Sequence, residues 1–307
     1  MKPAVIAAIA TLLLVSPGTM AQEGADSCEP SLLAASYNIR LDTAADGVNA
    51  WSNRKDFLIG QIAILRPHIL GMQEVLPHQR QELEQALSGY TFVGGGREDG
   101  RQAGEASPLA IDRASFALKA SGMFWLSPTP EMPSLGWDAS FKRVATWARL
   151  KRRSDGAALL AMNVHWDHQG LVARQESGKM IKNWLSRNLR KGEAVILMGD
   201  FNAEVAEESV RQLLGGSDGL VDTRMAATDG TIGPAISFNG FQPFPDGGEL
   251  IDHIFTGADI TVRRHGVIAQ HENGRVASDH FPVVALIDLP SRRKLPACGR
   301  QAAFSGA

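Results

Sequence analysis

Six short polar clusters interrupt the apolar stretches of this sequence, and most of them stand where an apolar run ends. Their members are all carboxylate, amide or imidazole side chains: Asn38, Gln73-Glu74, His165, Asp200-Phe201-Asn202, Asp252 and Asp279-His280. A carboxylate that closes a buried strand is unfavourable unless it is paired, hydrogen-bonded or bound to a metal. One such residue alone is explained as a turn residue, but six clusters of the same chemical kind predict convergence on one site.

The kinds of side chain in these clusters indicate a reaction. Carboxylate and amide oxygens without cysteine suit Mg²⁺ or Mn²⁺, which bind through one or two carboxylates and keep positions for water and substrate phosphate. A structural zinc site would need four nitrogen or sulfur ligands, and the sequence has no compact set with the usual spacing. A histidine paired with an aspartate acts as acid or base near neutral pH. Together these groups predict a Mg²⁺- or Mn²⁺-dependent transfer of a phosphoryl group to water.

The elements that must position these residues are visible as apolar runs typical of buried strands. The runs lie at 32–39, 68–72, 122–126, 144–150, 157–164, 194–198, 250–255 and 282–287. Helical spacing of apolar residues occurs at 54–65, 79–87 and 171–189, and Pro67 ends the first of these helices. Long stretches of strand without an intervening helix argue against a simple β-α-β repeat. The pattern therefore predicts an α/β fold with two sheets and helices packed outside them.

The first 21 residues have the features of a cleaved export signal. Lys2 precedes an apolar run at 5–15, and Thr19 and Ala21 place small residues at a cleavage site. The alternative is an N-terminal membrane anchor, but this run is shorter than the about 20 residues that span a bilayer. We predict an exported protein, periplasmic or secreted, with no transmembrane anchor. The mature chain, 22–307, is predicted to form a single domain with its core at about 32–289.

Charge and cysteine content limit the partners of this chain. The sequence has 31 Lys and Arg against 33 Asp and Glu, whereas a protein that binds long nucleic acid through its phosphates usually has a basic face. Basic runs at 151–153 and 292–294 are candidates for such a face, but solvated turns have the same composition. No heptad pattern predicts a stable protein partner. Cys28 and Cys298 could form a disulfide in an oxidising compartment, or remain two separate thiols.

Three of the clusters carry a resemblance to a known superfamily. In their order and spacing, Gly71-Met72-Gln73-Glu74-Val75, Gly199-Asp200-Phe201-Asn202 and Ser278-Asp279-His280-Phe281-Pro282 resemble motifs of the endonuclease/exonuclease/phosphatase superfamily. The resemblance runs from about Leu32 to Leu289. It implies a DNase I-like, four-layer α/β/β/α sandwich with the site at one end of two packed sheets. The Gln-Glu-Val form and the Asn-x-His-x-Asp-His stretch around His165 resemble most the deadenylase-type branch (carbon catabolite repressor, nocturnin and angel) and its secreted bacterial relatives.

The resemblance also implies roles for the metal- and phosphate-binding residues. Glu74 would be the main metal ligand, Asp279 would bind the metal directly or support it, and Asn38 would lie beside the metal and hold the phosphate. His165 and Asn202 would donate hydrogen bonds to the phosphoryl oxygens, and His165 would also assist the leaving oxygen. These residues would act on a phosphate-ester substrate with Mg²⁺ or Mn²⁺ as the cofactor.

The remaining residues would activate water. Asp200 would orient or deprotonate the attacking water, and Asp252 would fix the ring of His280. His280 would contact the phosphate or take the proton from the water, so the choice between Asp200 and His280 as the base stays open at this point. Arg40 stands where apurinic endonucleases of this superfamily carry an acidic, metal-associated residue, which puts a second metal in doubt.

Three substrate hypotheses follow. A nuclease or nucleotide phosphodiesterase is favoured by the deadenylase-like motif forms. A phosphatase or phosphodiesterase of small or lipid-derived phosphates, such as phosphosugars, inositol phosphates or sphingomyelin, fits the near-neutral charge. An inactive binding module on the same fold is the remaining alternative. The stretch 109–112 lacks the tyrosine that many nuclease members place near the phosphate, which argues against duplex DNA as the substrate.

Overall fold

A computed structural model describes residues 31–215 and 219–290 of the chain. The predicted export signal, the basic run at 292–294 and both cysteines, Cys28 and Cys298, lie outside these residues. Within the part that is described, no helix has the length and apolar character needed to cross a bilayer.

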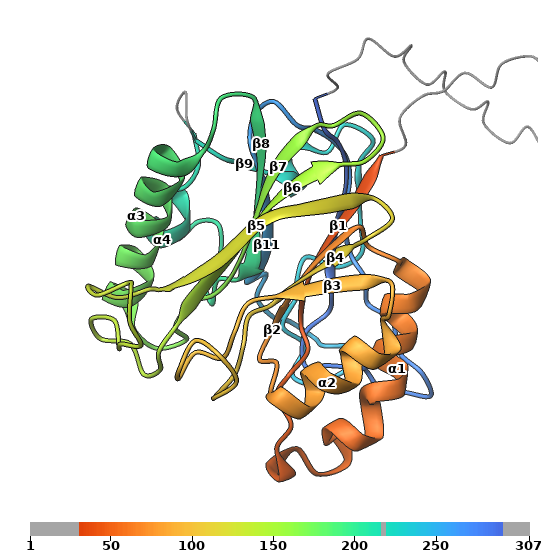
Figure 1. Ribbon diagram of the computed structural model, residues 1–307. Coiled ribbons are helices and arrows are strands. Elements are labelled where there is room, and N and C mark those ends of the chain that lie inside the picture. The colour runs from red at the N-terminus through yellow and green to blue at the C-terminus, as the bar shows by residue number, and fades with distance from the viewer. Residues whose placement is uncertain (1–30, 216–218, 291–307) are drawn as a thin grey trace, which may run out of the picture. The chain divides into compact units, whose positions relative to one another are not determined.

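The described chain contains two mixed sheets (Figure 1). The seven-stranded sheet has the order β10 (Thr231–Ile232), β12 (Thr261–Val267), β13 (Val283–Asp288), β1 (Leu32–Asn38), β2 (Ile69–Gln73), β4 (Leu109–Asp112) and β3 (Tyr90–Val93). The six-stranded sheet has the order β5 (Phe116–Trp125), β6 (Val144–Arg152), β7 (Ala158–His165), β8 (Glu193–Asp200), β11 (Asp252–Thr256) and β9 (Val221–Asp222). The prediction of two sheets is confirmed.

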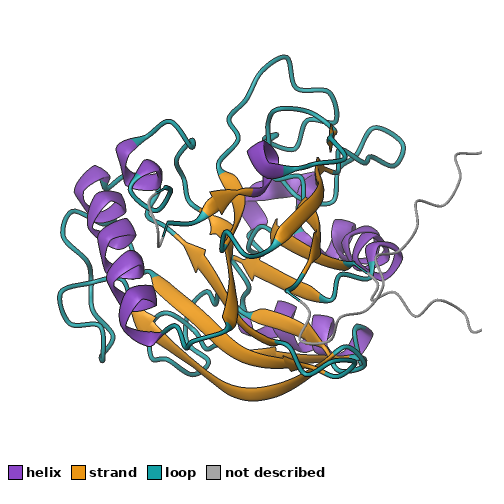
Figure 2. Ribbon diagram, turned by 90° about the horizontal axis from the view of Figure 1, so that it is seen from above, coloured by secondary structure: helices purple, strands orange, loops and turns teal. Residues whose placement is uncertain are grey.

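The longer helices lie outside the two sheets, as Figure 2 shows, whereas the four-residue helix after β9 contacts strands of both sheets. The helices are η1, a 3-10 helix (Ala44–Asn49), α1 (Trp51–Leu65), α2 (Pro77–Ala86), α3 (Leu171–Asn188), α4 (Glu208–Arg211) and α5 (Thr223–Ala226). Helices α1 and α2 lie on the side of the seven-stranded sheet, and α3 and α4 lie on the opposite side of the molecule (Figure 1). The helix α1 ends where Arg66 adopts a left-handed conformation (φ 47°) just before Pro67, which disfavours further helix.

Three hydrophobic clusters fill the three interfaces of this α/β/β/α sandwich. Residues of β1, β2, β7 and β8 meet between the sheets, and the other faces of these strands pack on α1 and α2 or on α3. Along β7, Leu159 and Ala161 face the opposite sheet, whereas Leu160 and Met162 face the helical layer. Alternate side chains of a strand point to opposite faces, so a strand buried on both faces has a continuous apolar sequence. This explains why the strands were visible as uninterrupted apolar runs.

Candidate active site

Strand register brings the polar clusters to one end of the two sheets. In the seven-stranded sheet, β1 and β2 run parallel, and Asn38 lies opposite Gln73 at their ends. In the six-stranded sheet, β7 and β8 run parallel and end with His165 opposite Asp200. The antiparallel strand β11 begins at this same end, with Asp252 opposite Asp200. Because the two sheets pack face to face, the ends of these five strands form one polar centre.

Asn38 connects the two halves of this centre. Its Nδ2 donates to Oε1 of Glu74 (3.0 Å), which follows β2, and to Oδ2 of Asp200 (2.9 Å), which ends β8. The side chain is completely buried. The backbone N–H of Asn202 donates to the other oxygen, Oδ1, of Asp200 (2.9 Å). Asp200 is thereby held in one orientation by groups from both sheets.

Two imidazole rings flank Asp200. Nε2 of His165 lies 3.5 Å from Oδ2 of Asp200, and Nε2 of His280 lies 3.9 Å from the same oxygen. On its other side, Nδ1 of His280 donates to Oδ2 of Asp252 (2.7 Å), which is within the range of charge-assisted hydrogen bonds. All four side chains are buried.

The electrostatic environment separates the protonation preferences of these groups. Burial raises the pKa of Asp200 above its ordinary value, and the nearby Asp252 carboxylate raises it further. Burial lowers the pKa of His280, but the combined effect of Asp252, Asp200 and Asp279 outweighs burial and raises it above the ordinary histidine value. For His165, burial and the guanidinium groups of Arg143 and Arg97 lower the pKa. The centre therefore favours a protonated His280 and a neutral His165.

A second group of charges adjoins Asn38. Arg40 Nη1 lies 4.0 Å from Glu74 Oε2, and Arg40 Nε lies 3.7 Å from Asp279 Oδ2. Burial raises the pKa of Asp279, while the nearby positive charges of His280, Arg40 and Arg54 oppose that effect. The Ser278 hydroxyl donates to the carbonyl of Asn38 (2.7 Å) and so attaches the Asp279 segment to the end of β1. Two carboxylates and the Asn38 amide thus lie together at the edge of the centre.

The backbone at this site adopts conformations that are unusual for residues other than glycine. Seven non-glycine residues of the described chain have positive φ, and three of them belong to the site: Arg40 (58°), Glu74 (62°) and Asn202 (47°). Such conformations are unfavourable by of order 1–3 kcal/mol each and tend to occur at functional sites. The position before Asp200 requires glycine, because a Cβ on Gly199 would lie 2.2 Å from the carbonyl oxygen of Val164.

Two sets of residues could hold a divalent metal. Among the described residues, Asp200, Asp252 and His280 form a group of three whose ligand atoms lie within 4.8 Å of one another. However, Asp252 and His280 are already hydrogen-bonded to each other. Among the positively charged groups of residues 31–215 and 219–290, only the Arg40 guanidinium lies within 4.0 Å of the Glu74 and Asp279 carboxylates, and such hard oxygen donors suit Mg²⁺ or Mn²⁺.

All eight residues predicted from the sequence lie in this centre. Direct contacts link Asn38, Glu74, His165, Asp200, Asn202, Asp252 and His280, and Arg40 links Asp279 to Glu74. This placement leaves their individual roles as predictions.

The sequence analysis overlooked an aromatic ring at the centre. The ring of Phe238 meets His280 edge to face with 5.2 Å between centroids, and the side chain is 41 % exposed. A backbone bridge joins the same two residues. Phe238 lies in a polar, glycine-containing loop in the sequence, and aromatic residues in such loops usually pack locally, so no signal distinguished it.

A small hollow beside His165 is lined by residues that the sequence analysis also did not assign. They include Arg97, Lys142, Arg143 and Glu105. Each cation is paired with a carboxylate: Arg97 with Glu105 (2.7 Å), Lys142 with Glu98 (2.7 Å) and Arg143 with Asp167 (3.3 Å). The hollow therefore offers many hydrogen-bonding groups without an unpaired positive charge among these three side chains.

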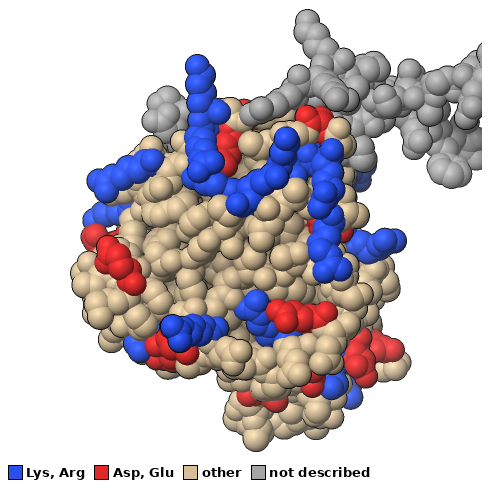
Figure 3. All heavy atoms as spheres, viewed as in Figure 1, with Lys and Arg blue, Asp and Glu red and all other residues tan. Residues whose placement is uncertain are grey.

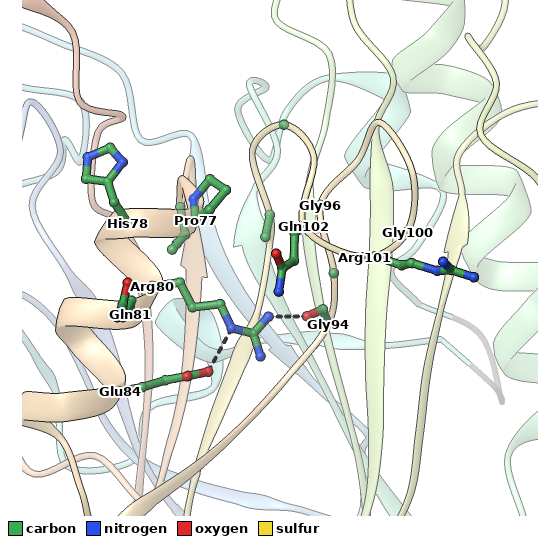
Figure 4. A pocket seen from close by; sticks show the side chains of 14 residues that line it. Pro77, His78, Arg80, Gln81, Glu84, Gly94, Gly96, Gly100, Arg101 and Gln102 are labelled. Atoms are coloured by element: carbon green, nitrogen blue, oxygen red, sulfur yellow. Dashed lines mark hydrogen bonds and ion pairs between the residues drawn. The ribbon is translucent and has the colours of Figure 1, made fainter.

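A larger hollow of about 810 Å³ lies between α2 and the segment 94–104 (Figure 4). Arg80 spans it, with its guanidinium donating to Glu84 (2.8 Å) and to the carbonyl of Gly94. Gly96 and Ala106 line this hollow, whereas the adjacent Arg97 and Glu105 line the hollow at His165. Adjacent residues at 96–97 and at 105–106 thus face different hollows, so the segment 94–106 lies between the larger hollow and the small one beside His165.

The chain is similar to known proteins in both sequence and structure. Residues 35–280 match the Endonuclease/Exonuclease/phosphatase family. The Bacteroides thetaiotaomicron mannosyl-6-phosphatase is 32% identical, covers 84% of this chain and 100% of its own, and superposes with a TM-score of 0.80. The human Nocturnin catalytic domain shares the fold at 20% identity, covering 86% of this chain and 95% of its own, with a TM-score of 0.67.

An uncharacterised protein of Acanthamoeba polyphaga mimivirus is 24% identical over 263 residues, which are 80% of this chain and 95% of that protein. The expected affinity to the deadenylase-type branch receives less support than the wider resemblance, because nocturnin is more distant from this chain than the Bacteroides phosphatase. The match over most of the chain, together with the order and placement of the three motifs, shows that the chain belongs to the endonuclease/exonuclease/phosphatase family.

Proposed function

We propose that this protein is a divalent-metal-dependent phosphatase of small phosphorylated molecules, with phosphosugars as the first candidates. The observation that carries this proposal is the 32% identity to a mannosyl-6-phosphatase, which extends over the whole length of that protein. The site contains the groups that hydrolysis of a phosphate ester requires: hydrogen-bond donors for the phosphoryl oxygens, an acid–base pair and carboxylates for a metal. This proposal adopts the phosphatase alternative in place of the nuclease that the motif forms favoured.

In the proposed reaction, the side chains of His165 and Asn202 donate hydrogen bonds to the phosphoryl oxygens, while Asn38 uses both N–H groups of its amide to hold Glu74 and Asp200. Asp200 orients the attacking water and takes its proton. As the bond from the water oxygen to phosphorus forms, the bond from phosphorus to the sugar oxygen breaks, and the sugar leaves as an alcohol that gains the proton released from the water. His280 donates from Nε2 to the phosphoryl group, because its Nδ1–H is committed to Asp252 at 2.7 Å and the carboxylate stabilises the protonated ring. Donors that are already in place before the reaction stabilise the charge that develops in the transition state.

Glu74 and Asp279 would hold the metal, with Asn38 beside it. When bound, Mg²⁺ or Mn²⁺ polarises a phosphoryl oxygen and offsets its developing negative charge. The donors fit such an ion because they are carboxylate oxygens, and because the Asp279 carboxylate is 10% exposed with only a distant guanidinium as its ion-pair partner. The other set, Asp200, Asp252 and His280, is better explained as the acid–base network.

The charges around the centre support a small substrate. The three cations at the hollow beside His165 are each paired with a carboxylate, and the lower part of the face shown in Figure 3, toward α2, carries both signs of charge. A protein that tracks long nucleic acid usually presents an unpaired basic surface. Export of the chain, predicted from residues 1–21, would place such a phosphatase where it meets phosphorylated sugars outside the cytoplasm.

The test is phosphate-ester hydrolysis by the purified mature chain, with and without Mg²⁺ or Mn²⁺. The substrates are mannose 6-phosphate, glucose 6-phosphate, an inositol phosphate, bis-p-nitrophenyl phosphate, and single-stranded RNA and DNA. We expect metal-dependent release of phosphate from the sugar phosphates, a loss of at least about 100-fold in Glu74→Gln, and full activity in the control Glu176→Gln on the outer helix α3. Faster cleavage of RNA or DNA than of any monoester would refute the substrate class.

A further inference from the structure

Arg40 is an unusual neighbour for a metal site, because it places a permanent positive charge among the carboxylates. Its guanidinium binds Asp46 of η1 in a bidentate manner, from Nε to Oδ2 (3.0 Å) and from Nη2 to Oδ1 (2.9 Å). The same group faces Glu74 Oε2 at 4.0 Å and Asp279 Oδ2 at 3.7 Å. Among the described residues, the Arg40 guanidinium therefore lies within 4.0 Å of three carboxylates but is hydrogen-bonded only to that of Asp46.

The backbone of Arg40 is held so that the side chain points into this group. Its N–H donates to Oδ1 of Asn38 (2.9 Å). Its carbonyl accepts from Nη2 of Arg54 (2.8 Å) and from Nε2 of Gln79 (2.9 Å). These bonds maintain a left-handed conformation (φ 58°), which is uncommon outside glycine. A surface arginine that merely decorated a loop would not require such support.

The charges in this contact group leave room for one divalent ion. The three carboxylates contribute −3 and Arg40 contributes +1, which gives −2, and the carboxylate side chains are only 8–13% exposed. Two further cations lie nearby. Arg54 donates to backbone carbonyls and not to these carboxylates, and the charge of His280 is balanced by Asp252, to which it is hydrogen-bonded. One ion of charge +2 brings the group to neutrality, whereas a second ion would leave it with an uncompensated positive charge.

The distances show how Arg40 acts without displacing the metal. Charge-assisted hydrogen bonds between nitrogen and carboxylate oxygen are about 2.7–2.9 Å long, so at 3.7 and 4.0 Å Arg40 takes up no lone pair of Glu74 or Asp279. Asp46 holds the guanidinium back at this distance. Glu74 accepts one hydrogen bond at each oxygen, from the Asn38 amide and from the backbone N–H of Leu41 (both 3.0 Å), and each oxygen keeps a second lone pair for a metal.

We propose that Arg40, held by Asp46, is a positioning residue that limits the centre to one divalent ion and weakens the binding of that ion. This inference rests on the proposed function, since it assumes that Glu74 and Asp279 hold the metal. The guanidinium shares the two carboxylates with the metal and repels a second cation at close range. The fixed charge of Arg40 thereby takes the place of a second ion.

The experiment is calorimetric titration of Mn²⁺ into the metal-free mature protein and three variants. Arg40→Gln removes the charge and keeps a side chain of similar length, and we expect it to bind the first ion at least about tenfold more tightly or to take up a second ion. Arg40→Lys keeps the charge and should bind one ion within about threefold of the unaltered protein. Asp46→Asn removes a negative charge and releases Arg40 toward Glu74 and Asp279, so its affinity should fall at least about threefold.

Opposite signs for Arg40→Gln and Asp46→Asn distinguish this proposal from a structural role, in which both variants would bind metal less well. A folded Arg40→Gln that binds a single ion, with equal or weaker affinity than the unaltered protein, overturns the proposal. If circular dichroism shows that Arg40→Gln does not fold, Asp46→Asn decides, and unchanged affinity there overturns it. If the unaltered protein binds no divalent ion, the proposed function fails instead, so the two failures are distinguishable.

Discussion

Replacing Asp252 with asparagine tests whether a buried carboxylate controls His280. Asp252 begins β11, is 1% exposed and accepts the Nδ1–H of His280 at 2.7 Å. Its second oxygen, Oδ1, is buried and has no hydrogen-bond partner within the part of the chain that the structure describes. Asparagine has nearly the same shape, so the change removes the charge and introduces an N–H donor with little effect on packing.

The size of the effect follows from where the new amide N–H must go. If the NH₂ faces His280, the ring proton moves to Nε2 and the ring can no longer be held as a stabilised cation. If the NH₂ takes the place of Oδ1, a buried donor is left without an acceptor, which is unfavourable by about 1–3 kcal/mol. In both arrangements the charge-assisted bond is lost. Since general acid–base catalysis contributes about 10²–10⁴-fold, we expect kcat to fall by that factor, or about 3–5 kcal/mol in activation free energy.

Steady-state hydrolysis of the best sugar phosphate at saturating metal measures this loss. KM should change less than about threefold, because His165 and Asn202, the donors proposed to bind the phosphate, are untouched. The matched control is Asp222→Asn, another buried carboxylate, whose side chain caps α5 by accepting from the backbone N–H of Arg224. Asparagine is as good a helix cap as aspartate, so the control should keep full activity.

Two results would refute this reasoning. A kcat within about fivefold of the unaltered protein would mean that His280 does not depend on the carboxylate. A loss of Mn²⁺ affinity well above about 100-fold in Asp252→Asn, more than the loss of a residue that only supports a ligand, would mean that Asp252 is itself a metal ligand. The second outcome would assign the metal to Asp200, Asp252 and His280 and would remove Glu74 and Asp279 from that role.

Three further predictions concern stability and substrate binding. Gly199→Ala should lower the free energy of unfolding by about 3 kcal/mol or more in urea titrations, because its Cβ would meet the Val164 carbonyl at 2.2 Å; a loss below about 1 kcal/mol would contradict this. Burial, followed by nearby cations, lowers the pKa of His265 to about 4, so the unfolded chain binds the proton first. Stability should therefore fall by up to about 3 kcal/mol from pH 6.5 to pH 4, and His265→Gln should flatten that slope. Phe238→Ala should raise KM for a sugar phosphate about tenfold with kcat changed less than threefold, whereas a fall in kcat alone would assign the ring to holding the catalytic imidazole.

The prediction for His265 depends on its hydrogen bonds. The Thr223 hydroxyl donates to the carbonyl of Ile254 (2.8 Å), so it must accept the Nδ1–H of His265 (2.9 Å). Nε2 of His265 is buried and has no partner among the described residues. A proton on Nε2 would create a buried donor without an acceptor, which is why the folded state resists protonation.

The amino-acid sequence alone predicted the layered fold, and it singled out the polar residues that the structure brings to one end of the two sheets. Strands such as β7 and β8 are buried on both faces, so their sequences are continuously apolar and identify them without any tertiary information. Residues such as Asp200 and His165 stand out because a charged or imidazole group at the end of such a strand is unfavourable without a partner. The motif order added the superfamily, and the family match over residues 35–280 agrees with it.

Tertiary structure alone decided how these residues meet. Asn38 bonds to Asp200 across 162 positions of sequence, and Phe238 packs on His280; both contacts depend on sheet packing and on a loop path that no local pattern encodes. The sequence showed Arg40 only as a departure from related enzymes. Its distances to Asp46 and Glu74 in the structure show which carboxylates its charge acts on, and therefore which variants test its role. The order of residues along a strand determines which side chains are buried and what chemical groups they carry. The distances between side chains on different strands depend on strand register and on the packing of the layers.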